Sequence, residues 1–256
     1  MSTTHSAISY DHGVSTKKLI GETIGNFFDR TVATHRDREA LVVRHQGIRW
    51  SWGELGRRVD DLAAGLLSLG LKRGDRIGIW SPNRAEWTLT QFATAKAGLV
   101  LVNVNPAYRR AELDYALNKV ECRALILAPS LKTSNYLEIV SDLVKAKKLP
   151  HLAHVIRLGE EKTPGMLNFD DVATAGGNAE KATLADLAPK LQFDDAINIQ
   201  FTSGTTGHPK GATLSHHNIL NNGYFVGEGL KLTPADRLCI PVPLYHCFGM
   251  VMGNLG

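Results

Sequence analysis

One short polar stretch, FTSGTTGHPKG from Phe201 to Gly211, combines residue types that could bind an anion. It contains three glycines, four hydroxyl side chains and one lysine. Glycine can adopt positive φ and turn backbone amides inward, and hydroxyl and ammonium groups add further donors. Hydrogen bonds to a charged group stabilise it by roughly 1.5–3 kcal/mol each, so several together could hold a polyphosphate. The candidate phosphate-binding residues are Thr202, Ser203, Gly204, Thr205, Thr206, Gly207, Pro209, Lys210 and Gly211.

The spacing of this stretch differs from two common phosphate-binding motifs. The pattern GxxxxGK[ST] requires a hydroxyl residue after its lysine, whereas Gly211 follows Lys210. The dinucleotide pattern GxGxxG is also absent from this stretch. The residues by themselves therefore leave two interpretations open, a plain surface turn and a site for a polyphosphate.

A second candidate is His246, in the stretch PVPLYHCFGM. A single histidine among apolar residues is most often a packed or surface histidine, so its type alone assigns it no role. His216 and His217 lie far from it in the sequence, and carboxylates at ligand spacing do not accompany these three histidines. The sequence therefore predicts no zinc or other metal site.

Composition limits the classes of protein that the chain can belong to. Its 256 residues are 43% hydrophobic and 21% charged, as expected for a globular protein with one large domain or two small ones. The net charge is +4, but the basic residues are scattered, which argues against nucleic-acid binding and suits small anionic ligands.

The cysteines and the N-terminal residues indicate the cellular compartment of the protein. Three cysteines without CxxC spacing predict reduced thiols rather than disulfides. Residues 1–17 lack the pattern of a signal or transit peptide, and no apolar run approaches the ~20 residues that span a bilayer. We therefore expect a cytoplasmic protein without a transmembrane segment, in which residues 1–17 form a loose N-terminal arm.

Helix and strand patterns alternate along the first part of the chain. The clearest helix runs from Ser51 to Gly70, where Ser51 and Glu54 predict a capping box. Further strands are expected at 75–81, 99–105, 122–128 and 154–158, and further helices at 81–98, 109–120 and 136–147. Such alternation forms right-handed βαβ crossovers, so the predicted fold class is α/β, with a mostly parallel sheet flanked by helices.

The chain divides into four predicted parts. Residues 1–17 are the arm, 18–158 a first α/β subdomain, 159–195 a surface connection with short helices, and 196–256 the start of a second α/β subdomain. In the last part, a strand at 197–203 leads into the polar loop, a second strand at 211–215 pairs back, and Ser215 caps a helix.

Three longer stretches carry a resemblance to a known superfamily. TSGTTGHPKGATLSHHN resembles the signature phosphate loop of the adenylate-forming (AMP-binding) enzymes, which include acyl-CoA synthetases, luciferases and adenylation domains. NPAYRRAELDYALNK and PLYHCFGM are similar to the matching stretches of medium-chain acyl-CoA ligases related to acyl-CoA synthetase family member 2. The resemblance implies that Thr202–Gly211 bind the phosphates of ATP. It also implies catalytic roles for Lys210 and for His246, which would lie by the acyl carboxylate and the α-phosphate.

The resemblance further implies an activity and its small-molecule substrates. A fatty acid would react with ATP, assisted by Mg²⁺, to give an acyl-adenylate and pyrophosphate, and the thiol of coenzyme A would then take the acyl group. Two alternatives remain: an adenylation domain that loads a carrier protein, and a non-catalytic nucleotide-binding fragment.

Family members are about twice this length. We therefore expect an N-terminal fragment, inactive alone, with an incomplete second subdomain and without the C-terminal domain.

Overall fold

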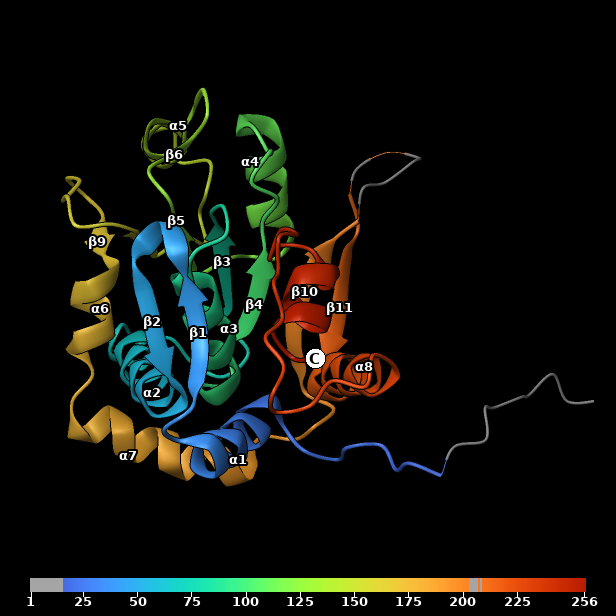
Figure 1. Cartoon of the computed structure of the whole chain (residues 1–256). Coiled ribbons are helices and arrows are strands. Elements are labelled where there is room, and N and C mark those ends of the chain that lie inside the picture. The colour runs from blue at the N-terminus through green and yellow to red at the C-terminus, as the bar shows by residue number, and fades with distance from the viewer. Residues whose placement is uncertain (1–15, 203–206, 208) are drawn as a thin grey trace, which may run out of the picture.

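A seven-stranded sheet forms the centre of the molecule (Figure 1). The computed structural model describes residues 16–202, 207 and 209–256. In the sheet the strands follow the order β11-β10-β4-β3-β5-β8-β9. They are β3 (Arg76–Trp80), β4 (Val100–Asn103), β5 (Ala124–Leu127), β8 (His154–Arg157), β9 (Leu167–Asn168), β10 (Ala196–Phe201) and β11 (Gly211–Ser215). Only the β10–β11 pair is antiparallel, so the predicted α/β fold with a mostly parallel sheet is confirmed.

The central strands are apolar along nearly their whole length because both faces of the sheet are covered. Every residue of β4 and β5 is buried. Three helices cross between the parallel strands: α3 (Ala85–Lys96), α4 (Arg110–Lys119) and α5 (Tyr136–Lys145). The chain passes from β3 to β4 on one side and then to β5 on the other side of β3. Right-handed crossovers in opposite directions place their helices on opposite faces. In agreement, α3 contacts α1 (Ile24–His35) and α2 (Trp52–Ser68), while α4 contacts α5.

Helix α2 begins as the sequence predicts. The Ser51 hydroxyl accepts from the N–H of Glu54 at 3.2 Å, and the Glu54 carboxylate accepts from the N–H of Ser51 at 3.1 Å. Gly70 follows the helix with φ of +78°, a conformation that glycine adopts without strain.

Helix α3 is shorter than the sequence predicted. The sequence predicted a helix over 81–98, but α3 begins at Ala85 and ends at Lys96. The side chain of Asn83 bonds the backbone of residues 242 and 244, and this contact holds residues 81–83 out of the helix.

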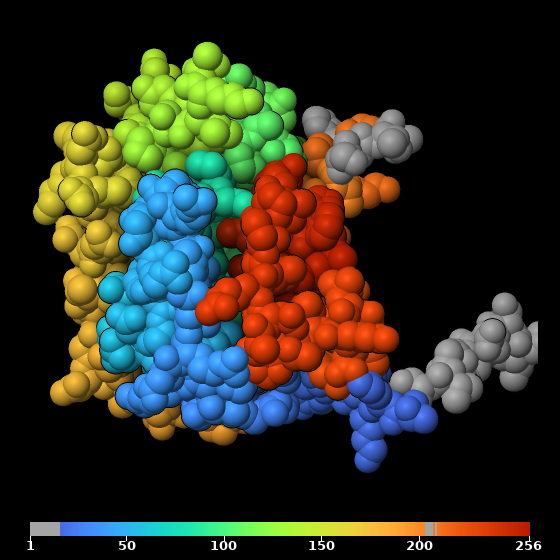
Figure 2. All heavy atoms as spheres, in the orientation of Figure 1, coloured from blue at the N-terminus to red at the C-terminus, as the bar shows by residue number. Residues whose placement is uncertain are grey.

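A hairpin precedes α2 and was not predicted. Strands β1 (Glu39–Val43) and β2 (Ile48–Ser51) pair antiparallel around the short 3₁₀ turn η1 (Arg44–Gln46). The carboxylate of Glu39 forms an ion pair with Arg237 at 3.3 Å. In the space-filling view the C-terminal residues accordingly lie at the surface beside this hairpin (Figure 2).

The connection between residues 159 and 195 packs tightly on α2. It contains β9, α6 (Phe169–Ala175), α7 (Asn178–Leu187) and the 3₁₀ turn η2 (Ala188–Lys190). A Cβ on Gly65 of α2 would lie 1.8 Å from the carbonyl oxygen of Val172 in α6. Only glycine fits at position 65, because α6 lies directly against α2. The connection therefore covers part of the core.

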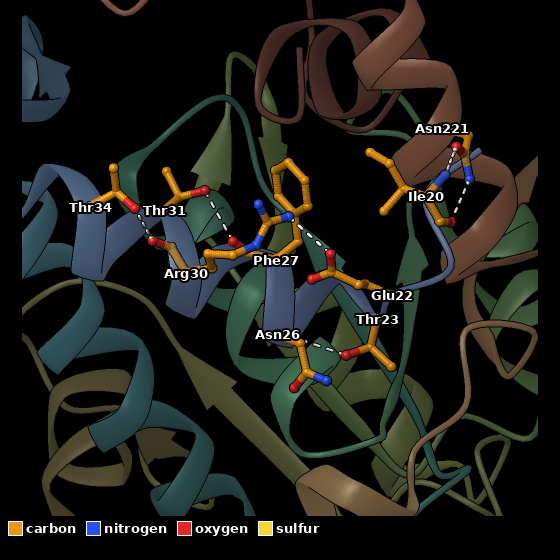
Figure 3. Close-up of polar contacts among 9 residues, drawn as sticks. All are labelled: Ile20, Glu22, Thr23, Asn26, Phe27, Arg30, Thr31, Thr34 and Asn221. Carbon is orange, nitrogen blue, oxygen red and sulfur yellow. Dashed lines mark hydrogen bonds and ion pairs between the residues drawn. The ribbon is translucent and has the colours of Figure 1, made fainter. Parts of the chain in front are cut away.

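Helix α8 (His216–Gly229) holds the N-terminal segment. The carboxamide of Asn221 accepts from the N–H of Ile20 at 2.7 Å and donates to its carbonyl at 3.0 Å (Figure 3). Lys17 forms an ion pair with Glu228 of the same helix. The rest of the predicted loose arm, residues 1–15, lies outside the described residues. A π-helical turn, η3 (Phe248–Gly253), packs on α8.

Strands β10 and β11, expected at the start of a second subdomain, bond to the same sheet as β4. These contacts describe one edge of the sheet and not the extent of a second subdomain, so the division at residue 196 stays a prediction.

A short antiparallel ribbon, β6 (Ser130–Leu131) and β7 (Ser134–Asn135), precedes α5. Within the described residues, no helix is long and apolar enough to cross a bilayer.

Candidate phosphate-binding site

The polar loop joins β10 to β11 at the carboxyl end of the parallel strands. Strand β10 runs parallel to β4, and β4 runs parallel to β3, so the carboxyl ends of all three lie along one edge of the sheet. The direction of the crossovers reverses between the neighbouring strands β3 and β5. In open α/β sheets ligands bind outside the carboxyl ends of the strands at such a switch point. The loop therefore lies at the carboxyl edge of the sheet, with β4 and β3 between β10 and the switch point.

The base of the loop is closed by backbone and side-chain bonds. The N–H of Thr202 donates to the carbonyl of Lys210 at 2.9 Å, and the N–H of Lys210 donates to the Thr202 hydroxyl at 3.3 Å. The phenol of Tyr115, on α4, donates to the carbonyl of Pro209 at 3.1 Å. Thr202 and Lys210, predicted together as phosphate ligands, are thus neighbours.

The glycines of the loop have distinct local roles. Gly207 adopts φ of +133°, which favours glycine. Gly211 starts β11, and a Cβ there would lie 3.1 Å from the Ile199 side chain on β10, so a larger residue would press on that strand. Four predicted phosphate-binding residues lie outside the described residues: Ser203, Gly204, Thr205 and Thr206.

Two donors at this edge lack protein partners. The side chain of Lys210 is exposed, and within the described part of the chain no carboxylate lies within ion-pair distance of its ammonium group. The amide nitrogen of Gln200, two residues before Thr202, is buried and has no hydrogen-bond partner among the described residues. Unused donors of this kind suit an anionic ligand.

His246 lies in an irregular segment between α8 and η3. Its ring is exposed, and the N–H of Phe248 donates to Nδ1 at 3.1 Å. Because Nδ1 accepts this bond, the neutral ring carries its proton on Nε2. The Nε2–H group is therefore a donor that can meet an oxygen of a ligand.

Tyrosines connect the two candidate segments. Burial, together with the Glu112 carboxylate and the phenols of Tyr245 and Tyr115, raises the pKa of Tyr108. Tyr245 directly precedes His246, and Tyr115 holds the loop through Pro209. The phenols that accompany the loop and the His246 segment thus lie near the same side chain.

The other two histidines, His216 and His217, make contacts within the fold. Nδ1 of His216 accepts from the N–H of Ile24 at 3.0 Å, and burial lowers the pKa of His216 to about 4. The ring of His217 packs against Phe193 with centroids 5.4 Å apart. In the described ranges, no group of three or more His, Cys, Asp or Glu side chains is arranged to hold a metal ion.

Sequence reasoning missed a set of amide side chains beside the site. Asn103, at the carboxyl end of β4, donates to the carbonyl of Tyr245 at 3.0 Å and accepts from Asn198 of β10 at 2.8 Å. Both asparagines are buried. A buried carboxamide near the end of a strand was the available signal, because such a group must find partners.

Comparisons with known proteins agree with the fold and the motif. The family described as AMP-binding enzyme matches residues 28–256. The mitochondrial medium-chain acyl-CoA ligase ACSF2 of Danio rerio is 46% identical over 96% of this chain and 43% of its own length. The putative acyl-CoA synthetase YngI of Bacillus subtilis is 39% identical over 93% of this chain and 45% of its own length.

Solved structures show the same fold. A putative long-chain-fatty-acid CoA ligase from Rhodopseudomonas palustris superposes with a TM-score of 0.77 at 25% identity, over 92% of this chain and 55% of its own. The chain thus spans less than half the length of the curated relatives that it matches. The family match covers far more than half of this chain and confirms the superfamily resemblance. The chain therefore belongs to the AMP-binding enzyme family.

Proposed function

We propose that the chain is the N-terminal region of an ATP-dependent fatty acyl-CoA ligase. The observation that carries the proposal is the β10–β11 hairpin at the carboxyl edge of a parallel sheet, whose two strands flank the stretch TSGTTGHPKG in the sequence. Relatives named as medium-chain acyl-CoA ligases, 44–46% identical to this chain, support the substrate class. The Lys210 ammonium, which has no ion-pair partner among the described residues, supports an anionic ligand at the hairpin.

In this proposal the loop acts on the leaving group. A carboxylate oxygen of the fatty acid attacks the α-phosphorus of ATP, and negative charge grows on the bridging oxygen of the departing pyrophosphate. Lys210 and the hydroxyls and amides of Thr202–Gly211 hold that charge by hydrogen bonds and electrostatic attraction. A protein nucleophile is not required, because the substrate supplies the attacking oxygen.

His246 acts on the other substrate. Its Nε2–H donates to the fatty-acid carboxylate and turns one oxygen toward the α-phosphorus. Correct placement of two reacting groups accounts for a large share of the rate in reactions of this kind. Lys210 and His246 should therefore affect different substrates when each is removed.

The remaining participants follow from the same chemistry. Mg²⁺ would arrive with the phosphates of ATP and neutralise part of their charge. Coenzyme A takes the acyl group in the second step. The sequence favours a cytoplasmic location, whereas the names of several relatives include the word mitochondrial. Cell fractionation with an antibody to the protein would separate the two compartments.

The test is acyl transfer by the full-length protein that contains this chain, with Mg-ATP and fatty acids of C4 to C16. The proposal expects AMP release and an acyl-CoA thioester. Transfer to a carrier-protein thiol but not to coenzyme A would instead support an adenylation domain. Absence of any fatty-acid-dependent AMP release would support a non-catalytic nucleotide-binding protein.

A further inference from the structure

The segment that carries His246 has little regular structure of its own. Residues 238–246 form neither helix nor strand, and the π-helical turn η3 follows at Phe248. Local backbone bonds are few: the N–H of His246 donates to Pro243 at 3.2 Å, and the N–H of Met250 donates to His246 at 3.0 Å. Residues of the segment also find hydrogen-bond partners outside it.

Carboxamide side chains from three other elements supply these partners. Asn83, in the turn before α3, donates to the carbonyl of Val242 at 2.8 Å and accepts from the N–H of Leu244 at 2.7 Å. The two bonds bracket Pro243, which has no N–H of its own. One amide group therefore sets the backbone on both sides of this proline.

Asn103 and Gln91 bond residues farther along the segment. Asn103 of β4 donates to the carbonyl of Tyr245, the residue directly before His246, at 3.0 Å. Gln91 of α3 donates to the carbonyl of Met250 at 3.2 Å and accepts from Asn254 at 2.9 Å. The exposed fractions of Asn103 and Gln91 are 2% and 4%, so water does not compete for these bonds.

Asn103 also reaches the strand that leads into the polar loop. Its amide oxygen accepts from Asn198 of β10 at 2.8 Å, while its amide nitrogen holds Tyr245. The same side chain thus ties β10, which leads to Thr202, to the segment that carries His246. A displacement of Asn103 would change the position of one half of the site relative to the other.

From these contacts we infer that Asn83, Asn103 and Gln91 are positioning residues for His246. This inference rests on the proposed function and adds to it: the three amides do not touch the substrates, but they set where Nε2 of His246 meets the acyl carboxylate. Removal of Asn83 or Gln91 should impair fatty-acid use more than ATP use, because their bonds to this segment do not involve the β10–β11 hairpin that carries the loop of Lys210.

The first arm of the test is structural and uses the 256-residue chain. Amide hydrogen exchange at the N–H of Leu244 is followed by NMR in the wild type and in Asn83→Ala. Exchange at Leu244 should become at least ~10-fold faster, since the variant removes the acceptor of that N–H. Asn118→Ala is the matched control, because Asn118 is also half-buried and also donates to another segment, at the carbonyl of Lys148. Unchanged exchange at Leu244 in Asn83→Ala would overturn the inference.

The second arm is a double-mutant cycle in the complete parent enzyme, measured as fatty-acid-dependent adenylation. Asn83→Ala should lower kcat/KM for the fatty acid on the order of 10- to 100-fold, with the KM for ATP changed by less than about twofold. In a His246→Ala background the same change should cost less than about twofold, because a positioning residue acts only through the residue it positions. Gln91→Ala, which leaves the bonds of β10 intact, provides a second cycle if Asn83→Ala folds poorly.

The possible outcomes distinguish a failure of the positioning role from a failure of the proposed function. An active wild type in which the losses from Asn83→Ala and His246→Ala multiply fully would overturn the positioning role alone. So would an equal effect of Asn83→Ala on the KM values of ATP and fatty acid, which is the signature of a general structural defect. A wild type without any fatty-acid-dependent reaction would refute the proposed function, and the positioning role with it.

Discussion

Acidification should weaken the fold through one buried histidine, His216. This residue begins α8, its side chain is 1% exposed, and its Nδ1 accepts from the N–H of Ile24 at 3.0 Å. Its Nε2 is buried without a hydrogen-bond partner among the described residues. Protonation of Nδ1 would replace an acceptor with a donor facing the Ile24 N–H, and it would place a charge in the core. Burial accordingly lowers the pKa of His216 from 6.5 to about 4, although the nearby Asp195 carboxylate raises it.

The sign and size of the effect follow from linkage. Between pH 6.5 and pH 4 the unfolded chain binds a proton at this histidine and the folded chain does not, so unfolding takes up a proton. The contribution of His216 to stability is present above pH 6.5 and is lost as the pH falls. The loss amounts to about 2 kcal/mol at pH 5 and about 3 kcal/mol at pH 4. Typical domains have only about 5–15 kcal/mol of stability, so the change is measurable.

Urea unfolding at pH 7 and pH 5, followed by tryptophan fluorescence, provides the assay. In His216→Asn the amide oxygen can replace Nδ1 as the acceptor for Ile24, but it does not titrate in this range. The variant should be less stable than the wild type at pH 7, yet lose about 2 kcal/mol less between pH 7 and pH 5. The exposed His45→Asn is the control and should follow the wild type. Equal losses in wild type and His216→Asn would refute the reasoning.

Three further predictions concern packing, thiols and the isolated chain. Gly65→Ala should destabilise the fold by about 2 kcal/mol or more, read from the urea midpoint, because its Cβ would lie 1.8 Å from the carbonyl oxygen of Val172; an unchanged midpoint would contradict the tight α2–α6 contact. Cys239 and Cys247 are exposed and should react with a thiol reagent in the native protein. Cys122 is buried, which raises the pKa of its thiol to about 12, so it should react only after unfolding; three equally fast thiols would contradict this. The 256-residue chain alone should form no acyl-adenylate, since it spans only 43% of its Danio rerio relative, and pyrophosphate release above background would show otherwise.

Local patterns predicted the sheet and helix α2 from the sequence because each signal is contained in a short stretch. Ser51 and Glu54 form their capping box within four residues of each other, β5 is a continuous apolar run, and β4 is apolar up to its last residue, Asn103. The start of α3 was not predictable in this way. Pro82 is a favourable first-turn residue, but Asn83 binds a segment about 160 residues later in the chain, and that contact is invisible in a local pattern.

The candidate site was likewise predictable from the sequence only in part. The composition of Thr202–Gly211 made the stretch a candidate anion site without any structure, and the family resemblance favoured this interpretation over a plain turn. The fold then added the contacts that no pattern could give, such as Tyr115 holding Pro209 and Asn103 holding the segment of His246. These partners are far apart in sequence and meet only because β4 and β10 are adjacent in the sheet.

The central claim is that Lys210 and its loop hold the phosphates of ATP during adenylation. At ~4 Å and an effective dielectric constant of ~20, an ammonium attracts one unit charge by about 4 kcal/mol before desolvation is subtracted. Lys210→Ala should therefore slow adenylation roughly 10- to 1000-fold, equivalent to about 1.4–4 kcal/mol of transition-state stabilisation. Transfer from a supplied acyl-adenylate to coenzyme A should change much less.

The most direct measurement is fatty-acid-dependent exchange of labelled pyrophosphate into ATP by the complete parent enzyme. Wild type, Lys210→Ala and the control Lys145→Ala, an exposed lysine of α5, would be compared at equal concentration. The account predicts rapid exchange in the wild type and the control, and a loss of at least ~10-fold in Lys210→Ala. Exchange at the wild-type rate in Lys210→Ala would contradict the assignment of this loop to the phosphates.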